Sequence, residues 1–421
     1  MLFSRFNILQ KISVIEDFVL VFLFVFGLSV PFFGTTSLLL LFVLPFRLSL
    51  IKGGILYPIR ILKSKYVVSI IASYFILVII ITLSTTLHLK YDFSLIPTII
   101  NTLIHLVVSI LLISLFIIKK RSISSFLNLI IYIFFAQSII QLLAFFSPAV
   151  LDIVHIFQPE SSIELADKFS GRRGLALAGT LFFGLSSIYG VAFLFLVHRC
   201  VRNGFIIWSD ILVFSLFIIG GFFTGRTFFI GVAVSLMYLV LAPIAKSEKL
   251  KFVSRLVLFI LCVVALVLAI IPPELYKKVY NLIWYVFEFV FNYLSTGHAT
   301  TTSTNNLFQN MYFEIPASTF LFGDGLYSGD TTTYYMGTDA GYMRNILLYG
   351  TVGLFFTMLP DLLLIFTGYN SRVKSEKLFS VFILIYMLIL HVKGEVFGYL
   401  ITLHTMLFTY YILINNQQKK V

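Results

Sequence analysis

Three side chains that can bind anions or exchange protons lie within five residues of one another, in the segment HVKGE (391–395). They are His391, Lys393 and Glu395. The segment lies between two apolar stretches, at an expected membrane boundary. One interpretation is a solvated turn that caps two helices. The other is a site with a cation for a phosphate group and a carboxylate or an imidazole for proton transfer.

Four arginines also lie next to apolar stretches. Arg172 and Arg173 belong to GRRG, Arg226 belongs to TGRT, and Arg344 follows GTDAGYM (337–343). Arginine is suited to bidentate recognition of phosphate, and charged residues at membrane depth are usually functional. The alternative is that each arginine extends its side chain to lipid headgroups. That explanation is weaker for four arginines together than for one.

Thr338 and Asp339 favour the start of a helix, because both residue types are good N-caps. Such a helix would run inward from the outer membrane surface, and its N-terminal amides and dipole would attract anions such as phosphate. Arg344 would lie about one turn further in. Four nearby tyrosines can stack on sugar rings: Tyr327, Tyr334, Tyr335 and Tyr342.

Composition places these residues in a polytopic membrane protein. Of 421 residues, 59% are hydrophobic and 11% are charged, whereas an ordinary globular domain has about 25% charged residues. A soluble protein of this size cannot hide so much apolar surface. Water-soluble enzymes, nucleic-acid binders and disulfide-rich secreted modules are therefore excluded.

Twelve apolar stretches can be transmembrane helices, which need about 20 residues each. We expect one all-α integral membrane domain over residues 1–421. Both termini should lie on one side, and two longer outer loops, 148–174 and 273–345, on the other. The expected spans are residues 16–33, 35–51, 66–86, 95–118, 125–147, 175–197, 205–222, 228–245, 256–272, 346–366, 378–392 and 397–415.

The formal net charge of +12 has a topological explanation first. The span ends on one side hold 21 of the 30 Lys and Arg residues, which makes that side cytoplasmic by the positive-inside rule. The exceptions on the outer side are the informative cations. They are Lys90, Lys168, Arg172, Arg173, Arg226, Lys277, Lys278, Arg344 and Lys393.

The outer loop 273–345 is long enough for substructure. Residues 274–294 are apolar and aromatic with interspersed charges, which predicts a helix lying in the outer interface. A thirteenth span is the alternative, but it would move the C-terminus outside. Gly323 and Gly325 mark a tight turn later in the loop.

Several chemistries lack their motifs. There is no G-x-x-x-x-G-K-[ST] segment, so no ATP-driven pump is implied. No Cys/His cluster has zinc spacing, and no carboxylate cluster suggests another metal. We therefore expect neither a metal nor a cofactor.

In this topology, four sets of residues together resemble the O-antigen and capsular polysaccharide polymerases (Wzy-type), which are related to the O-antigen ligases. The resemblance covers the whole chain at the level of topology. Ligases typically carry His-Asn where this chain has Thr338-Asp339, which favours a polymerase. The motifs are GRRG (171–174), TGRT (224–227), FGDGLYSGD (322–330) with GTDAGYMRNILLYGTVG (337–353), and HVKGE (391–395).

The resemblance implies a glycosyltransferase with a GT-C-like fold in the bacterial cytoplasmic (inner) membrane, with its active site facing outward. Donor and acceptor would be oligosaccharides linked to undecaprenyl pyrophosphate. An acceptor hydroxyl would displace the lipid pyrophosphate, and the chain would grow at its reducing end. Membrane lipids and a chain-length regulator protein would be further partners, and nucleic acid would not.

The resemblance also suggests roles for the charged residues. The outer arginines would bind the pyrophosphates, with Lys393 assisting, and their charge would stabilise the leaving group. Asp339, Glu395 and His391 are candidates for activating the acceptor hydroxyl or for positioning an arginine, and spacing does not choose among them. The assigned arginines are Arg172, Arg173, Arg226 and Arg344.

Two other classes of function remain as alternatives. One is a ligase-type glycosyltransferase. The other is a lipid-linked oligosaccharide flippase or another transporter, which should have two similar halves with broken helices at matching positions. The sequence has no such halves. A structural membrane protein would not need the outer arginines.

Overall fold

The computed structural model describes residues 2–30, 34–167, 173–205, 207–270, 273–298, 300–329 and 334–418. The chain is mostly helical, at 78%. A short antiparallel hairpin pairs β1 (Ser29–Val30) with β2 (Gly34–Thr35). This composition is compatible with the expected all-α membrane protein.

Among the described residues, six helices are long and apolar enough to cross a membrane. They are α4 (Lys65–Leu87), α5 (Ile96–Ile118), α6 (Ile123–Phe146), α9 (Phe182–Asn203), α17 (Gly341–Tyr369) and α18 (Lys374–Lys393). Shorter apolar helices also overlap expected spans. They are α2 (Thr36–Ser49), α10 (Ile207–Thr224) and α11 (Phe228–Leu241). The remaining expected spans overlap α1 (Leu2–Phe26), α12 (Lys246–Ile270) and α19 (Ile401–Gln418).

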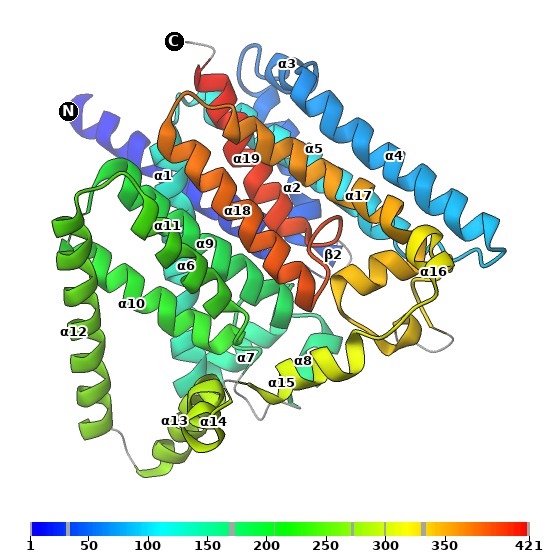
Figure 1. Cartoon of the computed structure of the whole chain (residues 1–421). Helices are drawn as coiled ribbons and strands as arrows, with labels where there is room; N and C mark the ends of the chain where they lie inside the picture. Colours follow the sequence, from blue (N-terminus) through cyan, green and yellow to red (C-terminus); the bar gives the residue numbers. More distant parts are fainter. Residues whose placement is uncertain are drawn as a thin grey trace.

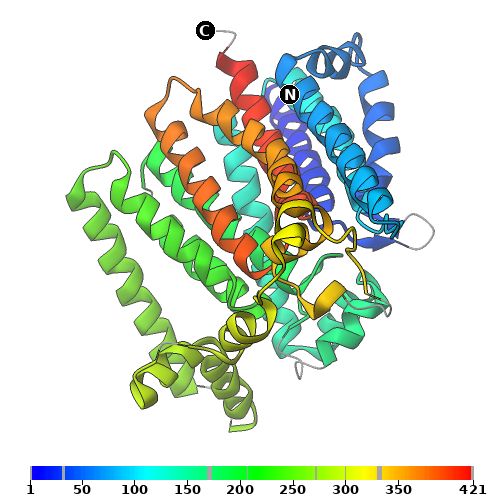
Figure 2. The same cartoon turned by 45° about the vertical axis from the view of Figure 1, so that its right-hand side comes forward.

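The other helices are connections between these long ones. Figures 1 and 2 show that α1 begins and α19 ends at one end of the molecule, here called the terminal end, where α3 (Leu56–Leu62) also lies. The helices of the two long loops gather at the opposite end, the loop end. These are α7 (Pro148–Ile156), α8 (Glu160–Asp167), α13 (Pro273–Val286), α14 (Glu288–Thr296), α15 (Thr302–Asn306), η1 (Leu307–Met311), α16 (Ala317–Phe322) and η2 (Tyr335–Gly337).

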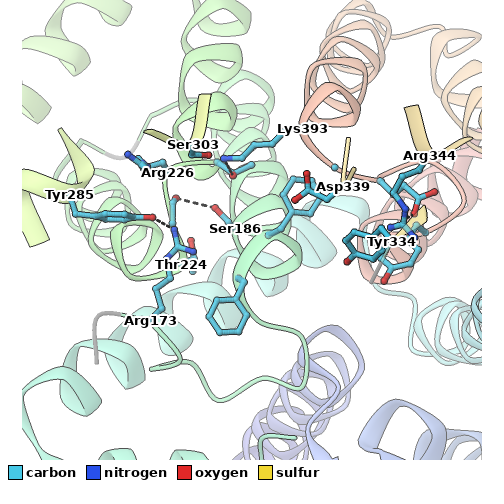
Figure 3. A pocket seen from close by; sticks show the side chains of 17 residues that line it. Arg173, Ser186, Thr224, Arg226, Tyr285, Ser303, Tyr334, Asp339, Arg344 and Lys393 are labelled. Atoms are coloured by element: carbon cyan, nitrogen blue, oxygen red, sulfur yellow. Dashed lines mark hydrogen bonds and ion pairs between the residues drawn. The ribbon is translucent and has the colours of Figure 1, made fainter. Parts of the chain in front are cut away.

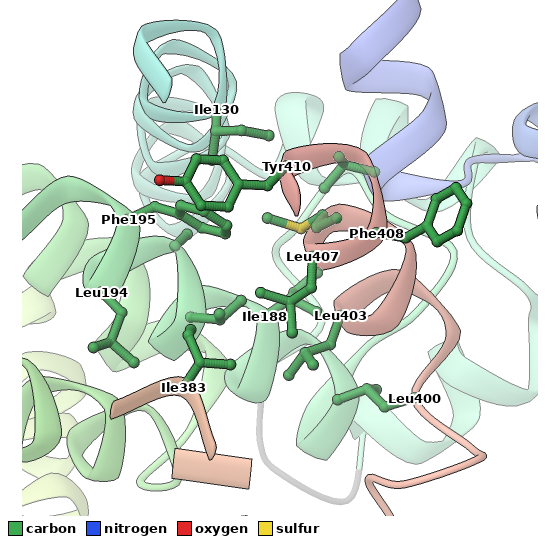
Figure 4. Packing of buried hydrophobic residues seen from close by; sticks show 14 of the residues in the cluster. Ile130, Ile188, Leu194, Phe195, Ile383, Leu400, Leu403, Leu407, Phe408 and Tyr410 are labelled. Atoms are coloured by element: carbon green, nitrogen blue, oxygen red, sulfur yellow. The ribbon is translucent and has the colours of Figure 1, made fainter. Parts of the chain in front are cut away.

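A buried apolar core holds the long helices together. Leu403, Leu407 and Tyr410 share one face of α19, because residues three and four positions apart are neighbours on a helix. In Figure 4 this face lies against Ile130 of α6 and Phe195 of α9. All five side chains are buried. The packing fixes the helix ends that carry the charged residues at the loop end.

The first expected span, 16–33, extends too far. Helix α1 ends at Phe26, and the next residue, Gly27, has a positive φ of 51°. Two side chains from the start of α2 bind the last carbonyl groups of α1. The Thr36 hydroxyl donates to the Leu23 carbonyl at 2.9 Å, and the Ser37 hydroxyl donates to the Phe24 carbonyl at 3.1 Å.

The expected span 175–197 begins too early. Helix α9 begins at Phe182, and the preceding backbone is not helical. The Gln158 side-chain amide donates to the carbonyl groups of Gly174 and Ala176, at 2.8 and 2.6 Å. These bonds occupy carbonyls that a helix would need internally.

The helix expected over 274–294 is two helices. Helices α13 and α14 are separated at Phe287, where the backbone leaves helical geometry (φ −95°, ψ 17°). Glu288, the first residue of α14, is held by Thr302, whose backbone N–H and hydroxyl donate to its Oε1 at 2.8 and 2.7 Å. The break therefore lets the carboxylate turn toward the rest of the loop.

The expected span 346–366 lies in α17, but this helix is broken in its N-terminal part. Gly350 has left-handed geometry, with φ 69° and ψ −174°. The break frees the carbonyl groups of Leu347 and Leu348. The backbone N–H groups of Asp324 and Gly325 donate to them at 2.6 and 3.1 Å. The turn expected at 323–325 thus supplies hydrogen-bond donors for the carbonyl groups at the break in α17.

Two glycines make this docking possible. A Cβ at Gly323 would lie 2.5 Å from the Tyr349 backbone nitrogen, and one at Gly350 would lie 2.1 Å from the Leu321 carbonyl oxygen. Both are closer than real Cβ contacts, and both residues have positive φ. The Ser84 hydroxyl of α4 also donates to the Leu348 carbonyl, at 2.7 Å. The loop, α17 and α4 are therefore joined at one point.

Candidate functional site

A pocket of about 390 Å³ lies at the loop end. Its walls come from segments that are far apart in sequence: the residues before α9 and its first turns, the α10–α11 turn, α13, α15, the start of α17 and the segment after α18. Figure 3 shows this cationic pocket. Its charged lining residues are Arg173, Arg226, Asp339, Arg344, Lys393 and Glu395.

The pocket thus brings together most of the charged residues that the sequence singled out. Arg172 lies outside the described residues. His391 does not line the pocket and is fully buried behind it.

Arg173 and Arg226 share one aromatic partner. Their guanidinium carbons lie 5.2 and 4.5 Å from the centre of the Tyr285 ring, within the range of cation–π attraction. Arg173 also donates to the Tyr285 hydroxyl. Arg226 forms an ion pair with Glu288. A ring from α13 and a carboxylate from α14 therefore position both arginines.

Glu288 is ionised in this arrangement. Burial alone would raise its pKa, but hydrogen bonds from Thr302 and the nearby positive charge of Arg226 more than offset that effect. The pKa of Glu288 consequently lies below its ordinary value. Its negative charge partly neutralises Arg226.

Lys393 adds a further positive charge beside the two arginines. Its Nζ donates to the Thr227 hydroxyl at 3.2 Å, and it forms no ion pair with a described residue. In Figure 3, Lys393, Arg226 and Arg173 occupy the same part of the pocket. Clustered like charges repel one another in a low-dielectric site, so a bound anion would stabilise this wall.

Arg344 occupies the other side of the pocket. Its guanidinium carbon lies 3.9 Å from the Tyr327 ring centre and 3.8 Å from the Tyr334 ring centre, so both faces are covered by aromatic rings. Its Nη1 lies 2.9 Å from Glu395 Oε2. Arg344 is 5% exposed, and its position is therefore tightly determined.

Glu395 and His391 form a network behind Arg344. The Tyr327 hydroxyl donates to Glu395 Oε2, and Asn345 Nδ2 donates to Oε1 at 2.6 Å. The Val396 N–H donates to His391 Nδ1 at 3.1 Å, so Nε2 carries the proton and donates to Asn345 Oδ1 at 3.1 Å. Burial raises the pKa of Glu395, and the charge of Arg344 opposes that rise.

This network favours positioning over proton transfer for two of the three candidate catalytic residues. Both oxygens of Glu395 and both ring nitrogens of His391 are bonded to protein groups. Glu395 also reaches the pocket lining, but its oxygens are engaged by Arg344, Tyr327 and Asn345, so it is less available to a substrate than a carboxylate without such partners. The bonds of Glu395 and His391 instead hold Arg344 in place.

Asp339 has the opposite environment. Its side chain is exposed, lines the pocket and makes no side-chain hydrogen bond or ion pair with another described residue. Figure 3 labels it between Lys393 and Arg344. Desolvation raises the pKa of Asp339, and the charges of Lys393 and Arg344 partly oppose that rise. A carboxylate with a raised pKa is a better general base.

The expected helix cap at Thr338 and Asp339 is wrong. Helix α17 begins at Gly341, its N-cap is Ala340, and no side chain caps it. The Thr338 hydroxyl instead donates to the Met311 carbonyl at 2.9 Å, which ties the preceding loop to η1. Asp339 is consequently left free to face the pocket.

Three of the tyrosines predicted as sugar contacts lie away from the lining of the pocket. Tyr327 is 7% exposed and packs behind Arg344, so it has no free ring face for a sugar. The Tyr335 hydroxyl donates to Asp324 at 3.3 Å, and the Tyr342 hydroxyl donates to the Leu388 carbonyl at 3.2 Å. None of these three tyrosines lines the pocket.

Other tyrosines take that position. Tyr285, Tyr334 and Tyr399 line the pocket, and Tyr334 and Tyr399 are 44% and 39% exposed. Of these, Tyr334 was among the expected aromatic residues. Tyr285 lies in the predicted interfacial helix, and Tyr399 lies four residues after Glu395. These two positions in the sequence are the features from which Tyr285 and Tyr399 could have been identified.

The pocket offers cationic and aromatic groups, which suit an anionic ligand with a ring or a hydrocarbon attached. Among the described residues, no group of three or more His, Cys, Asp or Glu side chains is arranged to hold a metal ion. Comparison of the chain with protein-family models, with curated proteins and with solved structures found no match.

Proposed function

We propose that the chain is a polysaccharide polymerase of the O-antigen or capsular type. It would join oligosaccharide repeats carried on undecaprenyl pyrophosphate, at the outer leaflet of the bacterial cytoplasmic membrane. The observation that carries the proposal is the convergence of Arg173, Arg226, Arg344 and Lys393 on one pocket, with Asp339 facing it. Each of these residues belongs to a motif that resembles the polymerase family.

The proposal includes a topology. All twelve expected spans cross the membrane in a GT-C-like arrangement, with both termini in the cytoplasm. The terminal end then faces the cytoplasm and the loop end faces outward. The positive-inside bias of the sequence supports this orientation.

The pocket's two sides supply what two lipid pyrophosphates need. Arg173, Arg226 and Lys393 form one cationic side, and Arg344 forms the other. Preorganised positive charge stabilises a pyrophosphate leaving group as negative charge develops on it. A sugar unit between the two sides would meet the exposed rings of Tyr334 and Tyr399.

Asp339 is the base in this reaction. The acceptor hydroxyl gives its proton to the Asp339 carboxylate, and its oxygen forms a bond to the anomeric carbon of the donor glycan. The bond between that carbon and the pyrophosphate oxygen breaks, and the electron pair leaves with undecaprenyl pyrophosphate. Glu395 and His391 act through Arg344, which they position.

Gel analysis of surface glycan tests the proposal. A strain lacking the gene should accumulate single capped repeats, and the wild-type gene should restore the ladder of long chains. Arg226→Ala should leave single repeats at normal protein level. Arg47→Ala is a matched control, because this arginine pairs with Glu16 on α1 at the terminal end.

The same gel separates the alternatives. Loss of a ligase removes glycan from the surface, whereas loss of a flippase traps lipid-linked units inside the cell. Long chains of normal length in the deletion strain, or in Arg226→Ala, would rule out the polymerase.

A further inference from the structure

A second cavity opens beside the cationic pocket, between the first turns of α11 and the last turns of α18. It has a volume of about 400 Å³. Its walls are mostly apolar, with Phe229 and Ile230 from α11 and Ile389 and Val392 from α18. Phe289 of α14 closes part of its outer end. We call this cavity the α11–α18 groove.

The groove and the cationic pocket meet at shared side chains. Arg226, Thr227 and Lys393 line both cavities. Lys393 Nζ donates to the Thr227 hydroxyl at 3.2 Å, so these groups form a polar boundary between an apolar cavity and a charged one. A ligand that spans the boundary needs an anionic part and a hydrocarbon part.

The groove walls face outward from the bundle. Ile389 and Phe289 are each 41% exposed, and Phe229 and Ile230 are half-buried. Helix α18 is apolar and long enough to cross a membrane, so an exposed apolar wall on it faces lipid. A ligand can enter this groove sideways from the bilayer.

We propose that the α11–α18 groove binds the polyprenyl chain of one lipid-linked substrate, with its pyrophosphate between Arg226 and Lys393. This inference rests on the proposed function, and it adds where one lipid carrier enters and which residues hold its tail. Arg173 lies on the same side of the pocket. A pyrophosphate ester matches that concentration of cations better than a phospholipid, which carries less negative charge.

The chain offers a matched control surface on the same helix. A cavity of about 580 Å³ near the other end of α11 is lined by Leu236, Val240 and Leu250. Its Lys249 donates to the carbonyl groups of Val240 and Ala242, at 2.8 and 2.7 Å. This lysine completes the end of α11, which leaves Lys246 as the remaining cation of the lining, whereas the α11–α18 groove shares both Arg226 and Lys393 with the cationic pocket.

Binding measurements on the full-length protein in phosphatidylethanolamine nanodiscs test the inference. The probes are undecaprenyl pyrophosphate, farnesyl pyrophosphate and inorganic pyrophosphate. We expect affinity to rise with tail length. Ile230→Trp should weaken undecaprenyl pyrophosphate binding about tenfold by filling the groove, with inorganic pyrophosphate unaffected. Leu236→Trp should change neither.

Ile389→Trp, on the facing and more exposed wall, repeats the test where Ile230→Trp fails to fold. Equal affinity for undecaprenyl pyrophosphate and inorganic pyrophosphate would overturn the inference. Wild-type binding by the two folded groove variants would do so as well. Displacement of undecaprenyl pyrophosphate by an equal amount of phosphatidylglycerol would show an unselective lipid site and overturn it too.

These outcomes separate the groove from the polymerase. If the groove variants bind normally while Arg226→Ala still leaves single repeats, the proposal for the groove is wrong and the proposal of a polymerase stands. If tail-dependent binding is lost in the groove variants while the deletion strain keeps long chains, the proposal for the groove is right and the proposal of a polymerase is wrong.

Discussion

Buried charged residues gather at both ends of the molecule. The two groups differ in whether their charged side chains also line a pocket. At the terminal end, Glu376 accepts from Arg202 on Oε1 and from Tyr410 on Oε2 at 2.5 Å, and His198 Nε2 lies 3.3 Å from Oε2. Glu376 is 1% exposed. At the loop end, by contrast, the cationic pocket has four cationic and two acidic residues in its lining.

The comparison shows that buried ion pairs alone do not indicate a site. In both Arg202–Glu376 at the terminal end and Arg344–Glu395 at the loop end, the carboxylate is buried and accepts from a tyrosine, although the Arg202 side chain is 26% exposed and that of Arg344 is 5% exposed. The difference is that Arg344 also borders an open pocket with excess positive charge. Ion pairs of this kind give little net stability, but breaking one leaves a buried charge unpaired.

The largest expected effect is at the loop end. Arg344→Ala should lower polymerisation about 1000-fold, since it removes a preorganised charge from the leaving group. It should also lower the free energy of unfolding by about 3–5 kcal/mol, because Glu395 would remain buried without its cation. Glycan gels and thermal unfolding of the purified protein measure the two effects.

A double variant sharpens this result. Adding Glu395→Gln to Arg344→Ala removes the unpaired charge, so stability should partly recover while polymerisation stays lost. Recovery of long chains in the double variant would show that Arg344 acts through structure alone.

The next effect concerns Asp339, the proposed base. Asp339→Asn should lower polymerisation about 100-fold, the lower end of the range for a general base, with no loss of stability. The pKa of Asp339 is raised, so its ionised form is disfavoured in the folded protein, and removing that charge costs no stability. Initial rates with lipid-linked oligosaccharide, together with a melting curve, measure both quantities.

The raised pKa also predicts a pH dependence. The base works only when ionised, so activity should fall with decreasing pH, beginning at a higher pH than an ordinary aspartate would give. Glu395→Gln should leave this acid limb unmoved if Asp339 is the base. An acid limb that disappears in Glu395→Gln would assign proton transfer to Glu395 instead.

A smaller effect is expected where one hydroxyl supports a cation. Tyr285→Phe keeps the ring under Arg173 and Arg226 but removes the hydroxyl that accepts from Arg173. The rate should fall about threefold, the magnitude of one lost hydrogen bond. Tyr285→Leu, which also removes the ring, should reduce the rate further; equal rates in both variants would mean that the ring contributes nothing.

The smallest effect on activity is expected at the terminal end. Arg202→Ala leaves Glu376 with less positive charge, so the free energy of unfolding should fall by about 3–5 kcal/mol. Chain length and rate per folded molecule should stay unchanged. A loss of activity without a loss of folded protein would remove the distinction between the two ends.

The sequence was most informative at the charged residues that depart from the expected topology. Arg226, Arg344 and Lys393 were identified because they depart from the positive-inside rule, and the structure brings them to one pocket. Tyr285 and Tyr399 were missed because the chain has 22 Tyr and 47 Phe residues, so an aromatic residue by itself carries little signal. Their value depends on contacts between distant segments.

The fold was predictable at the level of helices and not at the level of their interruptions. Each expected span overlaps a helix, because long apolar stretches indicate one directly. The break at Gly350 lies within such a stretch and depends on a loop more than 20 residues earlier in the chain. The position of Tyr327 was not predictable for the same reason, since that docked loop carries its ring behind Arg344.

The docked turn at 323–325 limits how the loop that contains it can be exchanged. Its N–H groups complete α17, the Leu348 carbonyl also receives Ser84 from α4, and a Cβ at Gly325 would lie 2.9 Å from that of His88. A chimaera that replaces this loop with a foreign one would therefore leave carbonyl groups of α17 without donors. The transferable unit consists of three pieces: the loop, the first turns of α17 and the last turn of α4.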